Sequence, residues 1–356
     1  MTRKIRGEIS GMVSEVLIGD HLDSEICRSL ERFDESLMFV SKGIPDPLRE
    51  RISRIEGADR TYHLDDGESC KTIETYNNLV LMLLERNFPR SGLISYAGGG
   101  TLGDLAGFLS STYKRGTPLH AIPTTLLAQV DSAIGGKNGL NASSVKNAIG
   151  TFHVPGMIFC DISVLNEKVL ADGLSEVVKY GMIGDPSILE ILESLTRENL
   201  IEDRGSLLAL VEKSVSLKMK MVSEDLYDRK GIRSTLNFGH TIGHAIESAT
   251  SNMVSHGRAV AGGMILESVI GEIAGIASEK YSGFIKRLLV DLGIELPRIR
   301  REDADRILSY IGNDKKVENG NIILNVPVSP GIPVGVKLEP HDFRKLLQEA
   351  ILEYEK

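Results

Sequence analysis

The segment LISYAGGGTLGDLAGFLSS, residues 93–111, begins as an apolar run, passes through a cluster of glycines and continues as an amphipathic stretch. Gly98, Gly100 and Gly103 have the spacing G-x-G-x-x-G. Such glycines permit a tight strand-to-helix turn and let a pyrophosphate approach backbone N–H groups at a helix N-terminus. An ordinary glycine turn explains the spacing equally well, because the acidic residue expected about 20 positions later is missing.

The rest of the chain divides into two patterns around this segment. Residues 1–162 alternate short apolar runs with amphipathic stretches, which is typical of a parallel sheet with covering helices. Residues 163–356 contain longer helical patterns, except for two strand-like runs around Ser329-Pro330-Gly331 that predict a hairpin. We therefore expect an α/β domain at 1–162 and a mainly α-helical domain at 163–356.

Charge and composition exclude several classes of protein. The 356 residues include 41 Lys plus Arg and 49 Asp plus Glu, so the net charge of -8 disfavours a nucleic-acid binder. The sequence contains neither an apolar signal segment nor an apolar run long enough to cross a bilayer. Cys27, Cys70 and Cys160 lack metal-binding spacing and are expected to be reduced and structural. We expect a cytoplasmic enzyme that binds neither nucleic acid nor membrane.

A second chemical signal lies between residues 114 and 161. A Gly-Gly-Lys turn ending at Lys137 and the pair Lys146-Asn147 resemble an anion-binding loop. It is not a Walker A loop, because Asp131 and Asn138 occupy positions where that motif needs glycine and a hydroxyl residue. Two ammonium groups, an amide and a carboxylate suit a multiply anionic, hydroxylated small molecule. A solvated turn is the alternative, although it would not need so many glycines.

Three of the eight histidines, His240, His244 and His256, lie within one short region. His240 and His244 are four residues apart and would share one helix face, as a pair of metal ligands does. Catalytic zinc sites often combine two histidines with one carboxylate and leave a position open. Spacing alone does not decide which two histidines bind, and Glu247 and Glu176 both qualify as the carboxylate.

A resemblance to the 3-dehydroquinate synthase family extends over about residues 67–316. It is carried, in order, by GGGTLGDLAGF, YKRG, PTTLLAQVDSAIGGKNG, KNAIGTF, PGMIFCD, GLSEVVKYG, LNFGHTIGHAIE, HGRAVAGGM and NDKK. The resemblance implies a homodimeric enzyme that uses NAD and Zn2+ or Co2+. It also implies an α/β, Rossmann-like nucleotide-binding N-terminal domain at 1–162 and a mainly α-helical, metal-binding C-terminal domain at 163–356, and the patterns above agree with this division into an α/β and a helical part.

The resemblance also implies a set of site residues. It assigns the metal to Glu176, His240 and His256, and places His244 at the substrate. The residues it implies for NAD are Glu68, Lys71, Gly98, Gly99, Gly100, Gly103, Asp104, Thr124, Thr125, Asp131, Lys137 and Lys146. Those implied for the substrate are Asp131, Lys137, Lys146, Asn147, Lys179, Lys218, Arg233, Asn237 and His244, with Arg115 from the neighbouring subunit and Lys315 or Lys316.

The family's substrate is a sugar acid phosphate, 3-deoxy-D-arabino-heptulosonate 7-phosphate, which is converted to 3-dehydroquinate in the second step of the shikimate pathway. The implied reaction is alcohol oxidation by NAD+, elimination of phosphate, return of the hydride, ring opening and aldol closure. The substrate carries a carboxylate and a phosphate, which explains a site rich in Lys, Arg and Asn.

Two other enzyme classes remain as alternatives. Sugar phosphate cyclases of the 2-epi-5-epi-valiolone or 2-deoxy-scyllo-inosose synthase type use substrates without a carboxylate, whereas Lys218, Arg233 and Asn237 favour an acid. Metal-dependent polyol dehydrogenases share the glycine turn and paired histidines but lack the VDSAIGGKNG and KN segments. A non-enzymatic binding module would give a metal site, an anion site and a nucleotide turn no common purpose.

Overall fold

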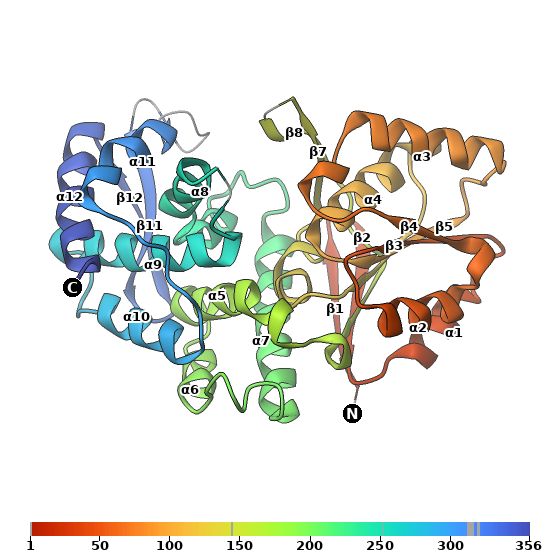
Figure 1. Ribbon diagram of the computed structural model, residues 1–356, viewed down its shortest axis with the longest axis horizontal. Helices are drawn as coiled ribbons and strands as arrows, with labels where there is room; N and C mark the ends of the chain where they lie inside the picture. Colours follow the sequence, from red (N-terminus) through yellow and green to blue (C-terminus); the bar gives the residue numbers. More distant parts are fainter. Residues whose placement is uncertain (1, 144, 252, 312–316, 319–320) are drawn as a thin grey trace. The chain divides into compact units, whose positions relative to one another are not determined.

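The computed structural model describes residues 2–143, 145–251, 253–311, 317–318 and 321–356 and divides into two compact units (Figure 1). The first unit comprises Met1–Val169 and Leu207–Tyr227, and the second comprises Leu170–Ser206 and Asp228–Lys356. The predicted α/β and helical characters are confirmed. The chain returns to the first unit after residue 206, which the division predicted at residue 162 did not anticipate.

The first unit is built on a seven-stranded sheet with the order β1-β2-β9-β6-β5-β3-β4. Its strands are β1 (Arg3–Ile9), β2 (Met12–Gly19), β3 (Ser36–Ser41), β4 (Thr61–Leu64), β5 (Leu93–Gly98), β6 (Leu119–Pro123) and β9 (Met157–Asp161). Neighbouring strands are parallel except for β1, which pairs antiparallel with β2. A separate antiparallel hairpin consists of β7 (Lys137–Ala142) and β8 (Val145–Phe152).

Helices cover both faces of this sheet. They are α1 (Asp23–Leu30), α2 (Asp46–Glu56), α3 (Ile73–Glu85) and α4 (Gly100–Thr112), with the short turns Ala58–Arg60, Glu68–Cys70, Tyr113–Arg115, Ala128–Ser132 and Ile162–Val164. Ile26 of α1 and Ile52 of α2 pack in one core cluster with Met38 and Val40, which alternate along β3 and so share one face. The helices α3 and α4 lie on the opposite face (Figure 1).

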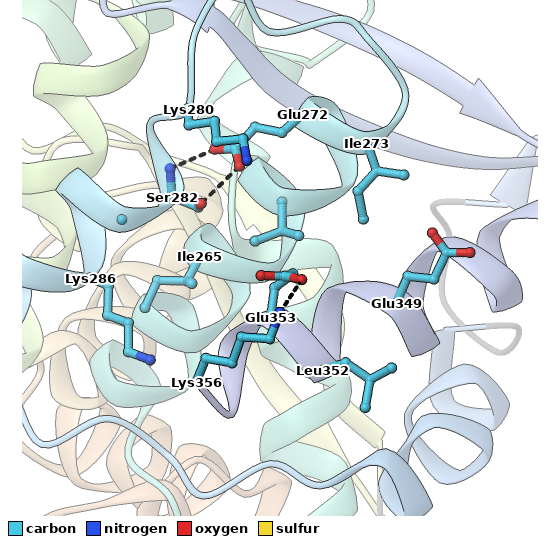
Figure 2. Close-up of a pocket in the computed structure, with 12 residues that line it drawn as sticks. Ile265, Glu272, Ile273, Lys280, Ser282, Lys286, Glu349, Leu352, Glu353 and Lys356 are labelled. Carbon is cyan, nitrogen blue, oxygen red and sulfur yellow. Dashed lines mark hydrogen bonds and ion pairs between the residues drawn. The ribbon is translucent and has the colours of Figure 1, made fainter.

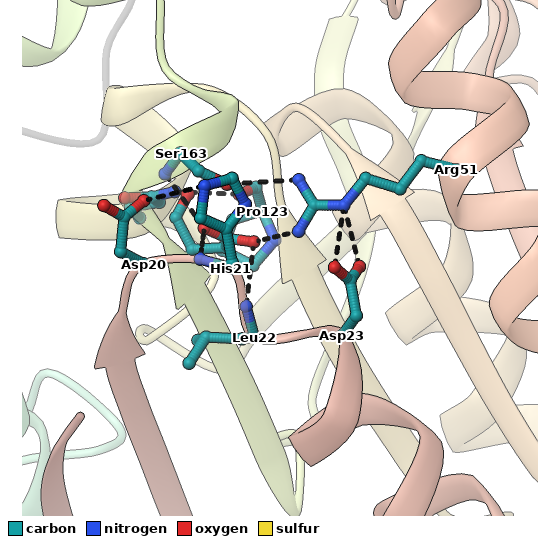
Figure 3. A network of polar contacts seen from close by, with 9 residues as sticks. Asp20, His21, Leu22, Asp23, Arg51, Pro123 and Ser163 are labelled. Atoms are coloured by element: carbon teal, nitrogen blue, oxygen red, sulfur yellow. Dashed lines mark hydrogen bonds and ion pairs between the residues drawn. The ribbon is translucent and has the colours of Figure 1, made fainter. Parts of the chain in front are cut away.

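A polar network ties the residues that follow β2 to Arg51 of α2 (Figure 3). Asp161 is 2% exposed and accepts hydrogen bonds from the backbone N–H groups of His21, Leu22 and Ser163. Arg51 of α2 contacts Asp161 Oδ2 at 2.8 Å. Burial opposes ionisation of Asp161, but these hydrogen bonds and the Arg51 charge lower its pKa. The network fixes the end of β9 beside the carboxyl end of β2.

The returning helix α7 (Arg204–Glu224) packs against the outer strand β1. A Cβ at Gly7 would lie 2.7 Å from Met219 Sδ, and Arg3 forms an ion pair with Glu212. The close approach explains why α7 belongs to the first unit although it follows two helices of the second.

The second unit is mainly helical. Its helices are α5 (Glu167–Ile183), α6 (Ser187–Glu193), α8 (His240–Ala249), α9 (His256–Ile273), α10 (Ser282–Asp291), α11 (Ala304–Ile311) and α12 (Pro340–Tyr354), with the short turns Arg233–Asn237 and Arg301–Asp303. The helix α9 is buried along most of its length and contacts α8, α10, α12 and a small sheet. In the described part of the chain, no helix is both long and apolar enough to cross a membrane.

The small sheet of the second unit contains the predicted hairpin. Its strands are β10 (Val317–Glu318), β11 (Asn321–Ser329) and β12 (Ile332–Leu338), in that order and antiparallel. The hairpin between β11 and β12 turns at Pro330 and Gly331, and Gly331 has a φ of 83°. Glycine adopts this conformation without steric cost, so the prediction from the sequence is confirmed.

Candidate functional site

The glycine turn lies between β5 and α4, at the carboxyl end of the parallel sheet. In the sheet, β4 lies on one side of β3 and β5 lies on the other, so the direction in which strands are added reverses between β3 and β5. The glycine turn follows β5 and therefore lies beside this reversal. Ligands bind at such points in open α/β sheets. A Cβ at Gly100 would lie 2.7 Å from Ser132 Oγ, and one at Gly103 would lie 2.8 Å from the Tyr96 hydroxyl oxygen. The turn therefore requires glycine for close packing.

The predicted threonine pair lies next to this turn. Thr124 directly follows β6, is buried, and donates its backbone N–H to the carbonyl oxygen of Gly98 at 3.0 Å. A Cβ at Gly99 would lie 3.7 Å from Thr125 Cγ2. The structure thus brings together the glycine turn and the Thr124-Thr125 pair, which the sequence separates by more than 20 residues.

A buried lysine joins three of the other predicted residues. Lys71 is 2% exposed, and its Nζ donates to Asp104 Oδ2 and Asn147 Oδ1, each at 2.6 Å. Glu68 Oε1 lies 3.7 Å from the same Nζ. Glu68 Oε2 also accepts from Asn141 Nδ2 at 2.7 Å, and Asn141 Oδ1 accepts from the Asn147 backbone N–H at 2.9 Å. Burial raises the pKa of Asp104 to about 6, and the Lys71 charge opposes this rise.

The remaining predicted residues of the first unit lie on its hairpin, on a short turn and on α7. Lys218, which is 4% exposed, reaches from α7 to form an ion pair with Asp131. Lys137 begins β7 and Lys146 lies on β8, and both are exposed. Arg115 is exposed at the end of the turn after α4, with a φ of 65°.

In the second unit, the predicted metal-binding histidines each begin a helix. His240 is the first residue of α8 and His256 the first residue of α9. The chain enters α8 through Gly239, whose φ is 77°, and a Cβ at Gly263 would lie 2.0 Å from the Gly239 carbonyl oxygen. The two helix backbones therefore approach closely, and the ring centroids of His240 and His256 lie 5.4 Å apart.

Hydrogen bonds at the far side of each ring decide what the histidines present to Glu176. His240 Nδ1 lies 3.1 Å from the Phe238 carbonyl oxygen, which can only accept, so Nδ1 carries the hydrogen. Its Nε2 lies 3.4 Å from Glu176 Oε1. His256 Nδ1 lies 3.3 Å from Glu247 Oε2, and its Nε2 lies 3.7 Å from the same Glu176 oxygen.

This arrangement fits a divalent cation. The ligand atoms of Glu176, His240 and His256 all lie within 4.8 Å of one another. In a tetrahedral site with bonds of about 2.1 Å, ligand atoms are about 3.4 Å apart, close to the spacings found here. Oε1 of the fully buried Glu176 has no hydrogen-bond partner among the described residues, whereas Oε2 forms an ion pair with Lys179. A cation between the three side chains would satisfy Oε1.

The charges of the cluster set its protonation. Burial favours a neutral carboxyl, but Lys179 and His240 hold the pKa of Glu176 well below its usual range. Burial and the Lys179 charge lower the pKa of His240 to about 3. Burial acts in the same direction on His256, yet the neighbouring carboxylates of Glu176 and Glu247 raise its pKa to about 10. His240 is therefore a neutral ligand at neutral pH, whereas a cation must displace a proton from His256.

A second group, His244, Glu247 and His256, also brings its ligand atoms within 4.8 Å of one another. It shares His256 with the first group, and its contact to that ring is through Nδ1. One imidazole would have to lose both its hydrogens to serve two cations. We therefore interpret Glu247 as the carboxylate that orients His256 for the first group, an arrangement common around metal-bound histidines.

The other predicted residues of the second unit lie on the helices that carry this cluster or on the turn that leads into one of them. Arg233, which is 5% exposed, and Asn237 lie on the short helical turn that leads into α8. Lys179 is buried one helical turn after Glu176 on α5. The His244 ring centroid lies 5.4 Å from that of His240. Lys315 and Lys316 lie outside the described residues.

Three residues that contact these groups were not predicted from the sequence. Ser132 faces Gly100 at the start of α4, and Asp172 and Glu267 contact the N-termini of the two helices that begin with the histidines. Each interacts with a partner far away in sequence, so local spacing does not reveal it.

The fold is that of the sugar phosphate cyclases. A solved structure of 2-deoxy-scyllo-inosose synthase, complexed with carbaglucose-6-phosphate, NAD+ and Co2+, matches 98% of this chain and 99% of that chain. The TM-score is 0.86 and the sequence identity is 25%.

Sequence comparison identifies the family within this class. The 3-dehydroquinate synthase N-terminal model matches residues 61–172, and the corresponding C-terminal model matches residues 173–317. The 3-dehydroquinate synthase of Thermoplasma volcanium is 41% identical over 326 residues, which cover 90% of each chain. That of Picrophilus torridus is 43% identical over 285 residues, or 80% of this chain and 82% of the relative. The chain belongs to the 3-dehydroquinate synthase family.

Proposed function

We propose that this protein is a 3-dehydroquinate synthase that depends on NAD and a divalent metal. Family membership supports the reaction class. The observation that carries the proposal is the convergence of His240 Nε2 and His256 Nε2 on one oxygen of the buried Glu176. This donor set suits a catalytic cation with an open position better than it suits a hydrogen-bonded core.

Glu176, His240 and His256 would hold Zn2+ or Co2+. Such a cation supplies Lewis acidity toward a substrate hydroxyl. Phe238 and Glu247 keep the Nδ1 hydrogens of the two rings in place, so that each Nε2 faces inward. The structurally similar 2-deoxy-scyllo-inosose synthase is solved in complex with Co2+, which supports the choice of metal.

The first unit is proposed to bind NAD, which would accept and return a hydride. The residues proposed for this role are Glu68, Lys71, Gly98, Gly99, Gly100, Gly103, Asp104, Thr124, Thr125, Asp131, Lys137 and Lys146. The turn at the N-terminus of α4 offers backbone N–H groups to a pyrophosphate. Lys71 hydrogen-bonds to Asp104 and forms an ion pair with Glu68, and this charged group suits the hydroxyls of a ribose.

The proposed substrate is a sugar acid phosphate, 3-deoxy-D-arabino-heptulosonate 7-phosphate. The residues proposed to contact it are Asp131, Lys137, Lys146, Asn147, Lys179, Lys218, Arg233, Asn237 and His244, with Lys315 or Lys316. The guanidinium of Arg233 suits a carboxylate because it can donate two parallel hydrogen bonds. Lysines on the hairpin suit phosphate, whose charge is spread over several oxygens.

A cytoplasmic homodimer is also proposed. All three cysteines are free, with Cys70 and Cys160 buried, and burial raises the pKa of the Cys70 thiol to about 11. Such inert thiols suit a reducing compartment. Arg115 is proposed to reach the neighbouring subunit's substrate, and its exposed position at the end of a turn leaves it accessible to a partner.

Phosphate release by the metal-loaded protein, given the heptulosonate phosphate and substoichiometric NAD+, tests the function directly. Absorbance of NADH is followed in parallel. We expect many phosphates per NAD+ without lasting NADH, because the hydride returns in each turnover. Phosphate released only from sedoheptulose phosphate or glucose phosphate would identify another cyclase. Net NADH formed from a polyol would identify a dehydrogenase.

A further inference from the structure

Two carboxylates outside the cluster of Glu176, His240 and His256 contact the N-termini of the two helices that carry these histidines. Glu267, on α9, reaches the start of α8, where His240 lies. Asp172, on α5, reaches the start of α9, where His256 lies. The first N–H groups of a helix have no partner within the helix and carry a partial positive charge, so a carboxylate there stabilises the helix end.

Glu267 contacts the backbone on both sides of His240. Its Oε2 accepts from the Gly239 N–H at 2.8 Å, and its Oε1 accepts from the Ile242 N–H at 3.1 Å. The side chain is 0% exposed, so water cannot replace these bonds. Both oxygens are engaged, which fixes the position of the first turn of α8 relative to α9.

Asp172 contacts both neighbours of His256. Its Oδ1 accepts from Ser255 Oγ at 2.6 Å and from the Gly257 N–H at 3.1 Å. A Cβ at Gly257 would lie 2.2 Å from the Asp172 Cα, so the two backbones are almost in contact. Asp172 lies one helical turn before Glu176 on α5, and it therefore connects the helix of the carboxylate ligand to that of His256.

We propose that Glu267 and Asp172 are positioning residues of the metal site. They hold the backbone at His240 and His256 so that both Nε2 atoms point to the Glu176 oxygen. This inference rests on the proposed function in one respect, that the cluster binds a divalent metal. A cation then meets three preset ligands and need not order the helix ends itself.

The two residues differ in a way that substitution can resolve. Glu267 uses both oxygens, so in Glu267→Gln an amide NH2 would face a backbone N–H and one bond is lost. Asp172 uses only Oδ1 for its two bonds, so Asp172→Asn can keep them, whereas Asp172→Ala cannot. The same loss of charge should therefore impair one site and spare the other.

Glu272 provides a matched control on the same helix. Its Oε1 accepts from the Ser282 N–H at 2.7 Å and its Oε2 from Ser282 Oγ at 2.9 Å (Figure 2). Glu272 caps α10 at the edge of a surface cavity that Lys280 and Lys286 also line. The helix α10 contains none of the three proposed metal ligands. Glu272→Gln thus removes the same charge from a helix cap of the same kind without touching the histidines.

The experiment measures Co2+ binding by the whole protein, with affinity from competition against a chelator and geometry from the visible absorption of the bound ion. We expect Glu267→Gln and Asp172→Ala to bind Co2+ about 10- to 100-fold more weakly with an altered spectrum. Asp172→Asn and Glu272→Gln should match the wild type. Thermal unfolding of each metal-free variant identifies any that fail to fold, and the Asp172 pair remains decisive if Glu267→Gln does.

Any of three results would overturn the inference. Wild-type affinity and spectrum in both Glu267→Gln and Asp172→Ala would show that the helix caps do not position the ligands. An equal change in Glu272→Gln would show a general loss of stability. A wild-type protein that bound no Co2+ would instead remove the proposed metal site itself, and with it this inference.

Discussion

His256 lies between two carboxylates, and this position determines how the metal-free protein responds to pH. Its Nδ1 lies 3.3 Å from Glu247 Oε2 and its Nε2 lies 3.7 Å from Glu176 Oε1. Burial would lower its pKa, but the two acids raise it from 6.5 to about 10. A raised pKa stabilises the folded state fully below about pH 6.5, and this contribution is lost as the pH rises towards 10.

We predict that the metal-free protein loses unfolding free energy between about pH 7 and about pH 10, because folded His256 gives up its proton in that range. Urea unfolding at a series of pH values measures the slope. His256→Gln should show a shallower slope in the same buffers. Identical slopes for the wild type and the variant would refute the assignment of the raised pKa to His256.

Glu176 combines two roles, since it is a proposed ligand and also the partner of the buried Lys179. We predict that Glu176→Gln abolishes stoichiometric Zn2+ binding and turnover together, because a neutral amide is a poor ligand. The variant also leaves a buried ammonium without a charge partner, which costs about 3 kcal/mol of stability. Equilibrium dialysis and phosphate release measure the first two effects. The exposed Glu193→Gln on α6 is the control, and full activity of Glu176→Gln without bound metal would contradict the proposal.

Arg233 is proposed to bind the substrate carboxylate. We predict that Arg233→Ala raises the KM for the carboxylated substrate by about 10-fold or more, since a charged hydrogen-bonded pair contributes about 1.5–3 kcal/mol. Steady-state phosphate release measures it. Metal affinity should not change, because Arg233 is not among the ligands. An unchanged KM would remove the main reason for preferring an acid substrate.

The residues of the metal cluster show what sequence spacing can and cannot establish. Histidine clustering predicted a metal site, but it left Glu176 and Glu247 as alternative carboxylates. The choice depends on which ring nitrogen each acid faces, and that is set by the packing of α5 against the starts of α8 and α9. Glu267 and Asp172 were missed for the same reason, because their partners are backbone groups on other helices.

Close packing between α8 and α9 depends on glycine at the element level. A Cβ at Gly263 would lie 2.0 Å from the Gly239 carbonyl oxygen and 2.8 Å from the Gly243 nitrogen, both of which are backbone atoms. Backbone cannot rotate aside as a side chain can. The two helices can approach this closely only because residue 263 has no side-chain methyl group. Their separation in turn determines the spacing of His240 and His256.

We predict that Gly263→Ala destabilises the protein by about 1–3 kcal/mol, as overpacking of a tight core does, and weakens metal binding. Gly283→Ala on α10 is the matched control, because nothing lies within 4 Å of its added Cβ. Thermal unfolding with and without Zn2+ compares the two. Equal stability of the two variants would show that α8 and α9 can move apart without cost.

Elements defined by local pattern were predicted well. The glycine turn after β5 and the hairpin at Pro330-Gly331 both depend on residues with special backbone freedom, which the sequence displays directly. The allocation of α7 was not predictable in this way. Its apolar positions indicate a helix with a buried face, but whether that face covers β1 or another helix depends on long-range contacts such as Met219 against Gly7.

At the scale of the whole molecule, the proposed dimer predicts that Arg115 acts in the active site of the neighbouring subunit. We predict that mixing Arg115→Ala subunits with Glu176→Gln subunits restores activity, because a mixed dimer would contain one site with an intact metal group and a partner arginine. Each variant alone should be nearly inactive. Co-expression with two affinity tags isolates the mixed dimer. No recovery in the purified mixed dimer would mean that Arg115 acts within its own subunit or has no role.

The return of α7 to the first unit also orders events during synthesis on the ribosome. The sheet of the first unit is complete at β9, but the helix that packs against its outer strand β1 is not complete until Glu224 has been translated. By then α5 with Glu176 has already been translated, whereas His240 and His256 have not. The pairing of Lys218 with Asp131 is completed in the same late step. A gene split after residue 169 would therefore leave the nascent first unit without its last helix.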